Sequence, residues 1–157
     1  MPSRRELIQM TEPEIAAFLT EKKTLIIVSN GRDGYPHPMP MWFATDSAGA
    51  LYCTTFSKAQ KVLNFERDPK ATLLVEAGEE YAELKSVLIY ADTTIVRDAD
   101  AVAEVLVNIS TKGTTIDEEQ RGKVREQVRA TAAKRVALKF TPSKIISWDH
   151  AKLGGKY

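Results

Sequence analysis

Hydrophobic positions along the first part of the chain predict a helix followed by a β-hairpin. Thr11 and Glu14 match a capping box, which predicts a helix through residues 15–19. The β-branched apolar run at 24–29 (TLIIVS) has strand length, and residues 30–34 (NGRDG) have the composition of a tight turn. The chain is therefore expected to enter a strand, turn, and return in a second strand within residues 35–43.

The second strand of this hairpin carries prolines at alternate positions, namely Pro36, Pro38 and Pro40. Proline has no N–H, and alternate residues of a strand direct their backbone groups to the same edge. One edge of the strand therefore lacks hydrogen-bond donors. The strand is either at the edge of a sheet or next to a flat ligand.

Later segments continue the strand pattern and then change to helical spacing. Strands are predicted at residues 51–55, 71–77 and 86–96, followed by helices at 98–110 and from Asp117 onward. Residues 136–140 and 145–149, on either side of a turn at Pro142, are predicted to close the chain as a hairpin. Together these elements predict a mainly β protein of the α+β class, a six-stranded barrel with flanking helices.

The stretch from residue 51 to residue 61 concentrates hydrogen-bond donors where a strand is expected to lead into a helix. Its donors are three hydroxyls and two lysines: Thr54, Thr55, Ser57, Lys58 and Lys61. A helix that begins near Lys58 adds unpaired backbone N–H groups and the positive end of its dipole, which favour a phosphate. The stretch thus predicts an anion site. The ordinary alternative is that Ser57 caps the helix and that the lysines lie on a solvated face.

Composition describes an ordinary globular protein and excludes several classes. The 157 residues are expected to form a single domain, 1–157, without a membrane span, and a net charge of +1 argues against a general nucleic-acid binder. Cys53 is the sole cysteine and the N-terminus lacks the apolar core of a signal peptide, so a cytoplasmic location is expected. His37 and His150 show no metal-ligand spacing, and no catalytic set is evident. Any chemistry is therefore expected to come from a bound cofactor.

Three segments carry a resemblance to a known family: residues 38–43 (PMPMWF), 52–69 and 146–148 (ISW). They resemble the FMN-binding split β-barrel superfamily, which holds the pyridoxamine 5′-phosphate oxidases and the oxidoreductases that use the deazaflavin coenzyme F-420. The resemblance implies a split β-barrel of Greek-key type, a homodimer with two cofactor sites between subunits, and a phosphate-binding lysine at Lys61. The cofactor-binding residues that it implies are Met39, Pro40, Met41, Trp42, Cys53, Thr54, Thr55, Ser57, Lys58 and Lys61.

Departures from the oxidases indicate which branch of the superfamily the chain resembles. The oxidases carry an arginine and a lysine at the two ends of the ring-binding strand, where this chain has Pro38 and Phe43, and their arginine-containing motif after the tryptophan is replaced by the sequence that follows Trp148 (DHAKLGG). The resemblance therefore implies a reductase that passes a hydride from reduced coenzyme F-420 to a small unsaturated organic substrate. The alternatives are an FMN-dependent enzyme resembling the oxidases and a carrier that binds the deazaflavin without turnover.

Overall fold

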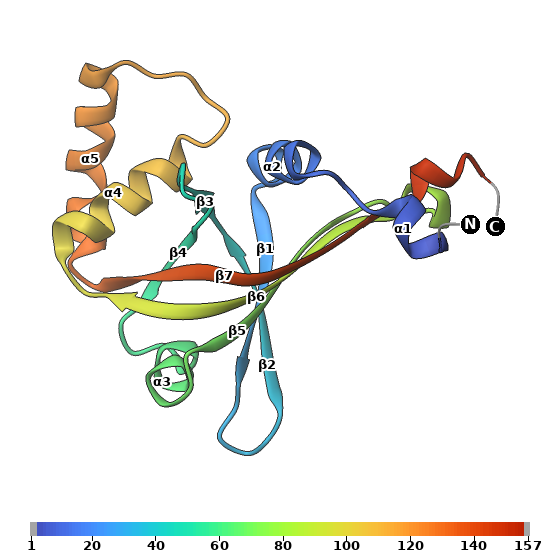
Figure 1. Ribbon diagram of the computed structural model, residues 1–157. Helices are drawn as coiled ribbons and strands as arrows, with labels where there is room; N and C mark the ends of the chain where they lie inside the picture. Colours follow the sequence, from blue (N-terminus) through green and yellow to red (C-terminus); the bar gives the residue numbers. More distant parts are fainter. Residues whose placement is uncertain (1–2, 156–157) are drawn as a thin grey trace.

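The chain folds around one antiparallel sheet whose strands follow the order β2-β1-β5-β6-β7-β4-β3. The computed structural model describes residues 3–155 (Figure 1). Its strands are β1 (Thr24–Asn30), β2 (Pro36–Trp42), β3 (Ala44–Thr45), β4 (Leu51–Phe56), β5 (Lys70–Ala77), β6 (Lys85–Val96) and β7 (Arg135–Asp149). Its helices are α1 (Arg4–Ile8), α2 (Glu12–Glu21), α3 (Gln60–Arg67), α4 (Ala99–Ser110) and α5 (Glu118–Ala132), with 3-10 turns at Tyr81–Glu83 and His150–Leu153.

A one-residue link between the two ends of the sheet accounts for its curl. β2 and β3 lie at opposite ends of the strand order, yet only Phe43 separates them along the chain. The two edges must therefore approach each other, which curls the sheet into a split barrel with flanking helices, as expected (Figure 1). The Phe43 amide donates to the Lys23 carbonyl (3.1 Å), and its ring is fully buried in the barrel core. Because the chain breaks at Phe43, the sheet of the described residues has seven strands rather than the predicted six.

β2 is an edge strand, as one of the two interpretations of its prolines required. The prolines stand opposite alternate residues of β1. Because they have no N–H, these proline positions must form the non-hydrogen-bonded pairs of the ladder. The ladder bonds therefore belong to the residues between them, His37, Met39 and Met41. Along residues 36–40 the free edge of β2 offers carbonyl oxygens without donors, which disfavours pairing with another strand.

The end of the chain is not the hairpin that the sequence predicted. β7 is one long strand that pairs with β6 from Lys85 to Val96. Pro142 lies at a β-bulge, where the register shifts between Tyr90 and Ala91. A proline is tolerated there because the ladder of hydrogen bonds is already interrupted. The proline thus accompanies a bend in a continuous strand and does not end it.

Two helices, α4 and α5, form a hairpin on one side of the barrel, and Glu104 joins them. α4 begins after its N-cap Asp98 and α5 after Asp117, as predicted. Arg125 and Arg121 of α5 both donate to the Glu104 carboxylate of α4. These hydrogen bonds lower the pKa of the carboxyl, and the bond from Arg125 has the larger effect. Within residues 3–155, no helix combines the length and the apolar character that crossing a membrane requires.

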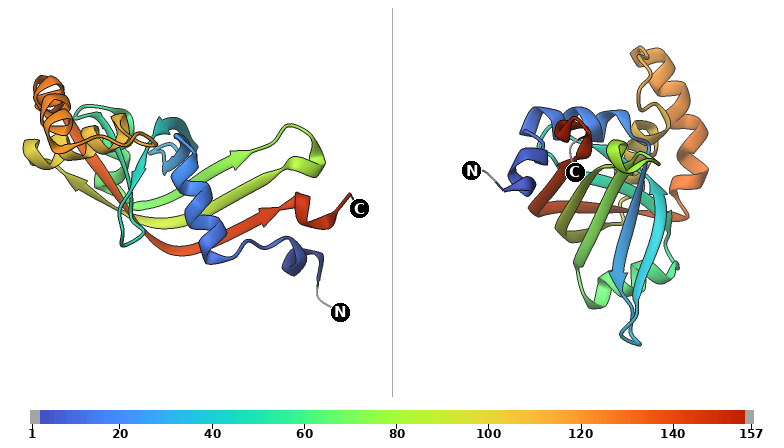
Figure 2. Two further views of the ribbon diagram at one scale, coloured as in Figure 1. Left: turned by 90° about the horizontal axis from the view of Figure 1, so that it is seen from above. Right: turned by 90° about the vertical axis from the view of Figure 1, so that its right-hand side faces the viewer.

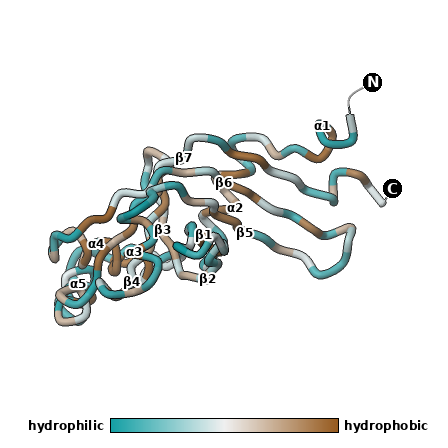
Figure 3. Tube along the Cα trace, turned by 90° about the horizontal axis from the view of Figure 1, so that it is seen from below, coloured by the Kyte–Doolittle hydropathy of each residue, from teal (hydrophilic) through white to brown (hydrophobic). Residues whose placement is uncertain are grey.

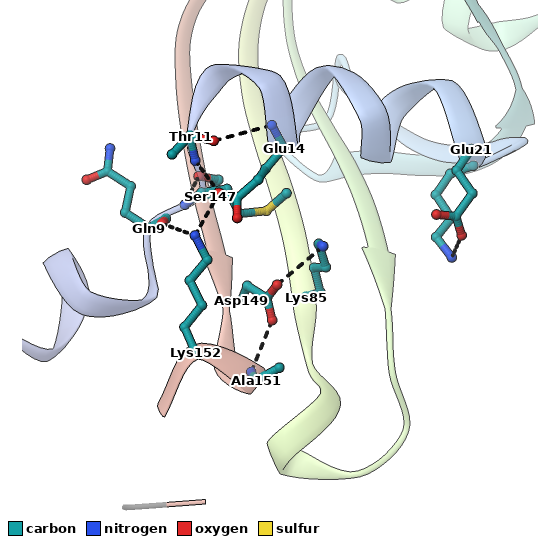
Figure 4. A network of polar contacts seen from close by, with 11 residues as sticks. Gln9, Thr11, Glu14, Glu21, Lys85, Ser147, Asp149, Ala151 and Lys152 are labelled. Carbon is teal, nitrogen blue, oxygen red and sulfur yellow. Dashed lines mark hydrogen bonds and ion pairs between the residues drawn. The ribbon is translucent and has the colours of Figure 1, made fainter. Parts of the chain in front are cut away.

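The far ends of β5, β6 and β7 extend beyond the barrel, together with both ends of the described chain (Figure 2). The turn between β5 and β6 at the tip of this arm is hydrophilic (Figure 3). Lys152 bonds the C-terminal segment to the N-terminal one, because its ammonium donates to the Gln9 carbonyl (2.9 Å) and to the Glu14 carboxylate (2.7 Å; Figure 4). Glu14 also completes the capping box of α2 with Thr11, which confirms the predicted helix start.

The contact between Lys152 and Glu14 predicts a dependence of stability on pH. The hydrogen bond from Lys152 and then that from the Thr11 amide lower the pKa of Glu14 from 4.5 to about 2. Because the folded-state pKa is the lower one, the carboxylate stabilises the fold above pH 4.5, and this contribution is lost as the pH falls toward 2. Glu14→Gln should therefore melt below the wild type at neutral pH, and the difference should shrink over that acidic range.

Thermal unfolding followed by circular dichroism measures this difference. Glu12→Gln is a matched control, since Glu12 lies in the same helical turn and makes no hydrogen bond to Lys152. A difference between Glu14→Gln and wild type that stays constant through the acidic range would contradict the prediction.

Candidate functional site

Lys61 is a buried lysine with a single long hydrogen bond. It lies in the first turn of α3 and is 7% exposed. Its ammonium donates to the Thr55 hydroxyl at 3.3 Å, and no carboxylate within residues 3–155 forms an ion pair with it. Burial lowers the pKa of Lys61, because desolvation disfavours the charged form. Since an ammonium has three N–H donors, two remain for a ligand.

Thr54 and Thr55 point to opposite faces of β4, so only Thr55 meets Lys61. Thr54 pairs with Ala137 of β7, whose side chain packs with residues of α4 on the outer face. Cys53 shares the inner face with Thr55 and is fully buried in the barrel core, where burial raises the pKa of its thiol. The structure therefore brings Thr55 and Lys61 together, buries Cys53 on the same face, and turns Thr54 toward α4.

Ser57 and Lys58 form an exposed turn before α3. The helix begins at Gln60 rather than near Lys58, with Ala59 at the N-cap position and without a side-chain cap. Ser57 is therefore not the cap, and its backbone N–H instead donates to the Lys134 carbonyl (3.2 Å). The N–H groups of Gln60 and Lys61 make no backbone hydrogen bond within residues 3–155. They lie where the helix dipole favours an anion.

Lys112 is a second lysine beside the barrel core, and no pattern in the sequence had singled it out. Its Nζ donates to the carbonyls of Leu19 (2.8 Å) and Lys22 (2.6 Å) at the end of α2 and lies 3.4 Å from the centre of the Phe43 ring. Burial lowers the pKa of Lys112 to about 8. The protein itself satisfies this ammonium, whereas it leaves that of Lys61 largely unsatisfied. Lys112 is therefore held by the fold, whereas Lys61 keeps hydrogen-bond donors that a ligand could use.

The four residues predicted to line a cofactor ring occupy both faces of β2. Met39 and Met41 are half-buried on the barrel side, where Met41 packs against the core. Pro40 and Trp42 point outward, and Trp42 is 66% exposed. β2 also contacts β4, the strand that carries Thr55. An apolar strip on β2 and the donors near the end of β4 therefore belong to neighbouring elements.

A hollow of about 810 Å³ lies between the β1–β2 hairpin and α3. Its lining includes Arg32 and Tyr35 from the hairpin and Gln60 and Arg67 from α3. His37 is half-buried in its wall, and its Nδ1 makes no hydrogen bond within the described residues. The volume falls within the range of small-molecule sites, about 300–1,000 Å³.

The donors around Lys61 fit a phosphate group. A phosphate accepts hydrogen bonds from ammonium, hydroxyl and backbone N–H groups at once. Lys61, Thr55 and the first turn of α3 supply these three kinds of donor. Among residues 3–155 no group of three His, Cys, Asp or Glu side chains is placed to hold a metal ion. The site is therefore suited to bind and orient a phosphorylated organic ligand.

Comparison with known proteins gives a consistent picture. The family model described as pyridoxamine 5′-phosphate oxidase matches residues 11–149. A conserved hypothetical protein from Mycobacterium tuberculosis superposes with a TM-score of 0.85 at 32% identity, covering 99% of this chain and 95% of that one. No curated protein sequence matches the chain.

More distant solved structures share the fold alone. An F-420 reductase has a TM-score of 0.62 at 19% identity, covering 92% of this chain and 98% of its own. A heme storage protein from Vibrio cholerae has a TM-score of 0.62 at 18% identity, covering 87% of this chain and 94% of its own. The names of these two proteins describe different functions, so the shared fold alone does not determine an activity.

The contrast between the two lysines predicts opposite effects on the ligand-free protein. Lys61→Met should leave the free energy of unfolding unchanged or raise it, since it removes a buried charge that lacks an ionic partner. Lys112→Met should lower the free energy of unfolding by about 1–3 kcal/mol, because two carbonyls lose a charged donor. Urea unfolding of both variants measures the difference. Equal losses in the two variants would assign Lys61 to the fold instead.

Proposed function

The chain belongs to the pyridoxamine 5′-phosphate oxidase family, and from that premise we propose that it is an oxidoreductase that uses the deazaflavin coenzyme F-420 to reduce an unsaturated organic substrate. The observation that carries the proposal is the buried ammonium of Lys61, whose one described partner is the Thr55 hydroxyl. When bound, the reduced deazaflavin supplies a hydride from C5 of its ring. The residues of the chain bind, orient and shield the reacting groups.

Phosphate binding is the role proposed for the end of β4 and the start of α3. Lys61 supplies the positive charge, Thr55 a hydroxyl, and the uncapped first turn of α3 its free N–H groups. Because Lys61 is already buried, an arriving phosphate replaces missing partners and does not have to displace a carboxylate. Lys58 and Ser57, exposed in the preceding turn, are placed to add weaker, solvent-screened contacts.

Ring binding is the role proposed for β2. Met39 and Met41 provide a half-buried apolar surface, and the free edge of the strand presents the carbonyl oxygens of its prolines as acceptors. Position 43, where the oxidases have a lysine, is the fully buried Phe43, so no charge approaches the ring from there. An apolar surface of this kind excludes water and orients a planar ligand. It supplies no feature that favours FMN over a deazaflavin.

A homodimer is also proposed, because large apolar side chains remain open beside this site. Trp42 on β2 is 66% exposed and Phe56 at the end of β4 is 57% exposed. Exposed apolar side chains that gather in a patch mark interaction surfaces, and the commonest soluble oligomer is a symmetric homodimer. Sedimentation at micromolar protein concentration should show dimers. Monomers under these conditions would remove the shared site from the proposal.

Lys61→Ala is expected to weaken binding of the phosphorylated cofactor by about 1–3 kcal/mol, the scale of a lost charge-assisted hydrogen bond. Thr55→Val should weaken it less, because only one neutral donor is lost. Fluorescence titration with coenzyme F-420 measures both effects. Lys70→Ala is the matched control, since Lys70 is an exposed lysine just beyond α3. Unchanged affinity in Lys61→Ala would reject the phosphate role.

The choice of cofactor is tested by parallel titrations of wild-type protein with coenzyme F-420 and FMN. Coenzyme F-420 should bind more tightly at low salt, and the reduced form should support single-turnover reduction of at least one member of a panel of conjugated substrates. Equal or tighter binding of FMN would replace the proposal with the FMN-dependent alternative. Tight deazaflavin binding without reduction of any panel member would favour the carrier.

A further inference from the structure

A second hollow, of about 590 Å³, lies between α2 and the turn that joins β3 to β4. α2 contacts β3 at the end of the barrel away from α3 (Figure 1). Because β4 begins after this turn and ends before α3, the second hollow and Lys61 lie at opposite ends of one strand. The proposed cofactor site therefore leaves the second hollow unused, although its volume suits a small molecule.

The floor of the second hollow is apolar. Ile15, Ala16 and Leu19 of α2 line it, and their spacing places them on one side of the helix. Ile145 of β7 also lines it and is 44% exposed, whereas Leu19 is buried in the barrel core. The Thr20 hydroxyl donates to the Ala16 carbonyl (2.8 Å), so its hydrogen is used within the helix. The floor thus offers a partly buried surface to the apolar body of a ligand.

Hydrogen bonds hold both walls of the second hollow. The Asp46 carboxylate accepts from the amides of Ala48 and Ala50 (2.9 Å each) and so closes the β3–β4 turn. It also accepts from the Tyr52 hydroxyl of β4 (2.9 Å). The opposite wall, α2, is held at its C-terminal end by Lys112, whose ammonium donates to two carbonyls there. The second hollow is therefore formed without a ligand, which lowers the cost of ordering on binding.

The charged side chains that line the second hollow are two carboxylates, Glu12 on α2 and Asp46 on the turn. Glu14, in the same turn of α2, is paired with Lys152. Glu12 forms no ion pair within residues 3–155. Because the lining holds carboxylates and no cationic side chain, its charge complements a cation. The apolar floor adds a preference for a cation with a hydrocarbon body.

We propose that the second hollow binds an organic ammonium ion, a small molecule with an apolar body and one cationic amine. The body packs on Ile15, Leu19 and Ile145, and the amine lies at the Glu12 carboxylate. Asp46, on the opposite wall, adds to the negative potential. An anion of the same shape is repelled by both carboxylates. The inference does not depend on the proposed function, since it uses none of the residues assigned to the cofactor.

Three probes that share an indole ring and a two-carbon linker test the charge preference: tryptamine is cationic, tryptophol is neutral and indole-3-propionate is anionic at pH 7. Each is titrated into the wild-type protein while the methyl resonances of Ile15 and Ile145 are followed by NMR. Tryptamine should shift both resonances saturably and bind at least about tenfold more tightly than indole-3-propionate, with tryptophol between them. High salt should narrow these differences.

Variants separate the charge from the floor. Glu12→Gln should weaken tryptamine binding by about two- to fivefold, the scale of an exposed ion pair, and leave tryptophol within about twofold. Ile145→Ser should weaken binding of both probes, because it removes part of the apolar surface. Glu21→Gln is the matched control and should change neither affinity, since Glu21 lies at the other end of α2 and pairs with Lys22 (3.1 Å).

Several outcomes would overturn the ammonium site. These are equal affinity of the wild type for tryptamine and indole-3-propionate, equal losses for tryptamine and tryptophol in Glu12→Gln, and probe-induced shifts confined to residues outside the second hollow. Absence of binding by all three probes would overturn it as well. In that case, separation of dimers into monomers by Ile145→Ser in sedimentation would show that a second copy of the chain covers the floor instead.

Discussion

Burial of the Lys61 ammonium without an ionic partner is the constraint that organises the proposed site. A lysine in this position would ordinarily lose its charge or acquire a carboxylate, and within residues 3–155 it has only the Thr55 hydroxyl. Lys112 shows what a satisfied ammonium looks like in the same protein, with two carbonyls and an aromatic ring around it. The contrast supports the proposal that the ammonium of Lys61 binds a ligand.

The fold produces this constraint through the closure of its sheet. Phe43 joins the two ends of the strand order and forces β2 toward β4, while the Ser29–Asn64 hydrogen bond holds α3 against β1. Lys61 lies one turn before Asn64 in α3. These contacts therefore fix Lys61 against the inner face of the sheet, near the end of β4. The prolines of β2 leave its outer edge without donors, so a strand does not readily cover that edge. The donors around Lys61, the apolar strip on β2 and the hollow beside α3 are thus consequences of one sheet topology.

Local chemistry made part of this structure predictable. The Thr11–Glu14 capping box, the edge strand with three prolines and the helix start at Asp117 each depend on a few neighbouring residues, and all three are present. Pro142 was misread because the bulge beside it, with Ser143 as the extra residue of β7, is defined only by pairing with β6, which is far away in the sequence. The alternative role of Ser57 as the N-cap was an equally local inference. It failed because the turn runs two residues further before α3 begins. The hollow that Arg32 and Arg67 line and the hydrogen bonds of Lys112 depend on tertiary contacts that no local pattern encodes.

An NMR titration of the Lys61 side chain tests the central claim most directly. The pKa of Lys61 is measured from the ¹³Cε shift in the ligand-free protein and again with saturating coenzyme F-420. Burial should hold the ligand-free pKa below the ordinary lysine value of 10.5, and a phosphate at the ammonium should raise it. A pKa that does not change on binding would show that the cofactor lies elsewhere and would contradict the phosphate site.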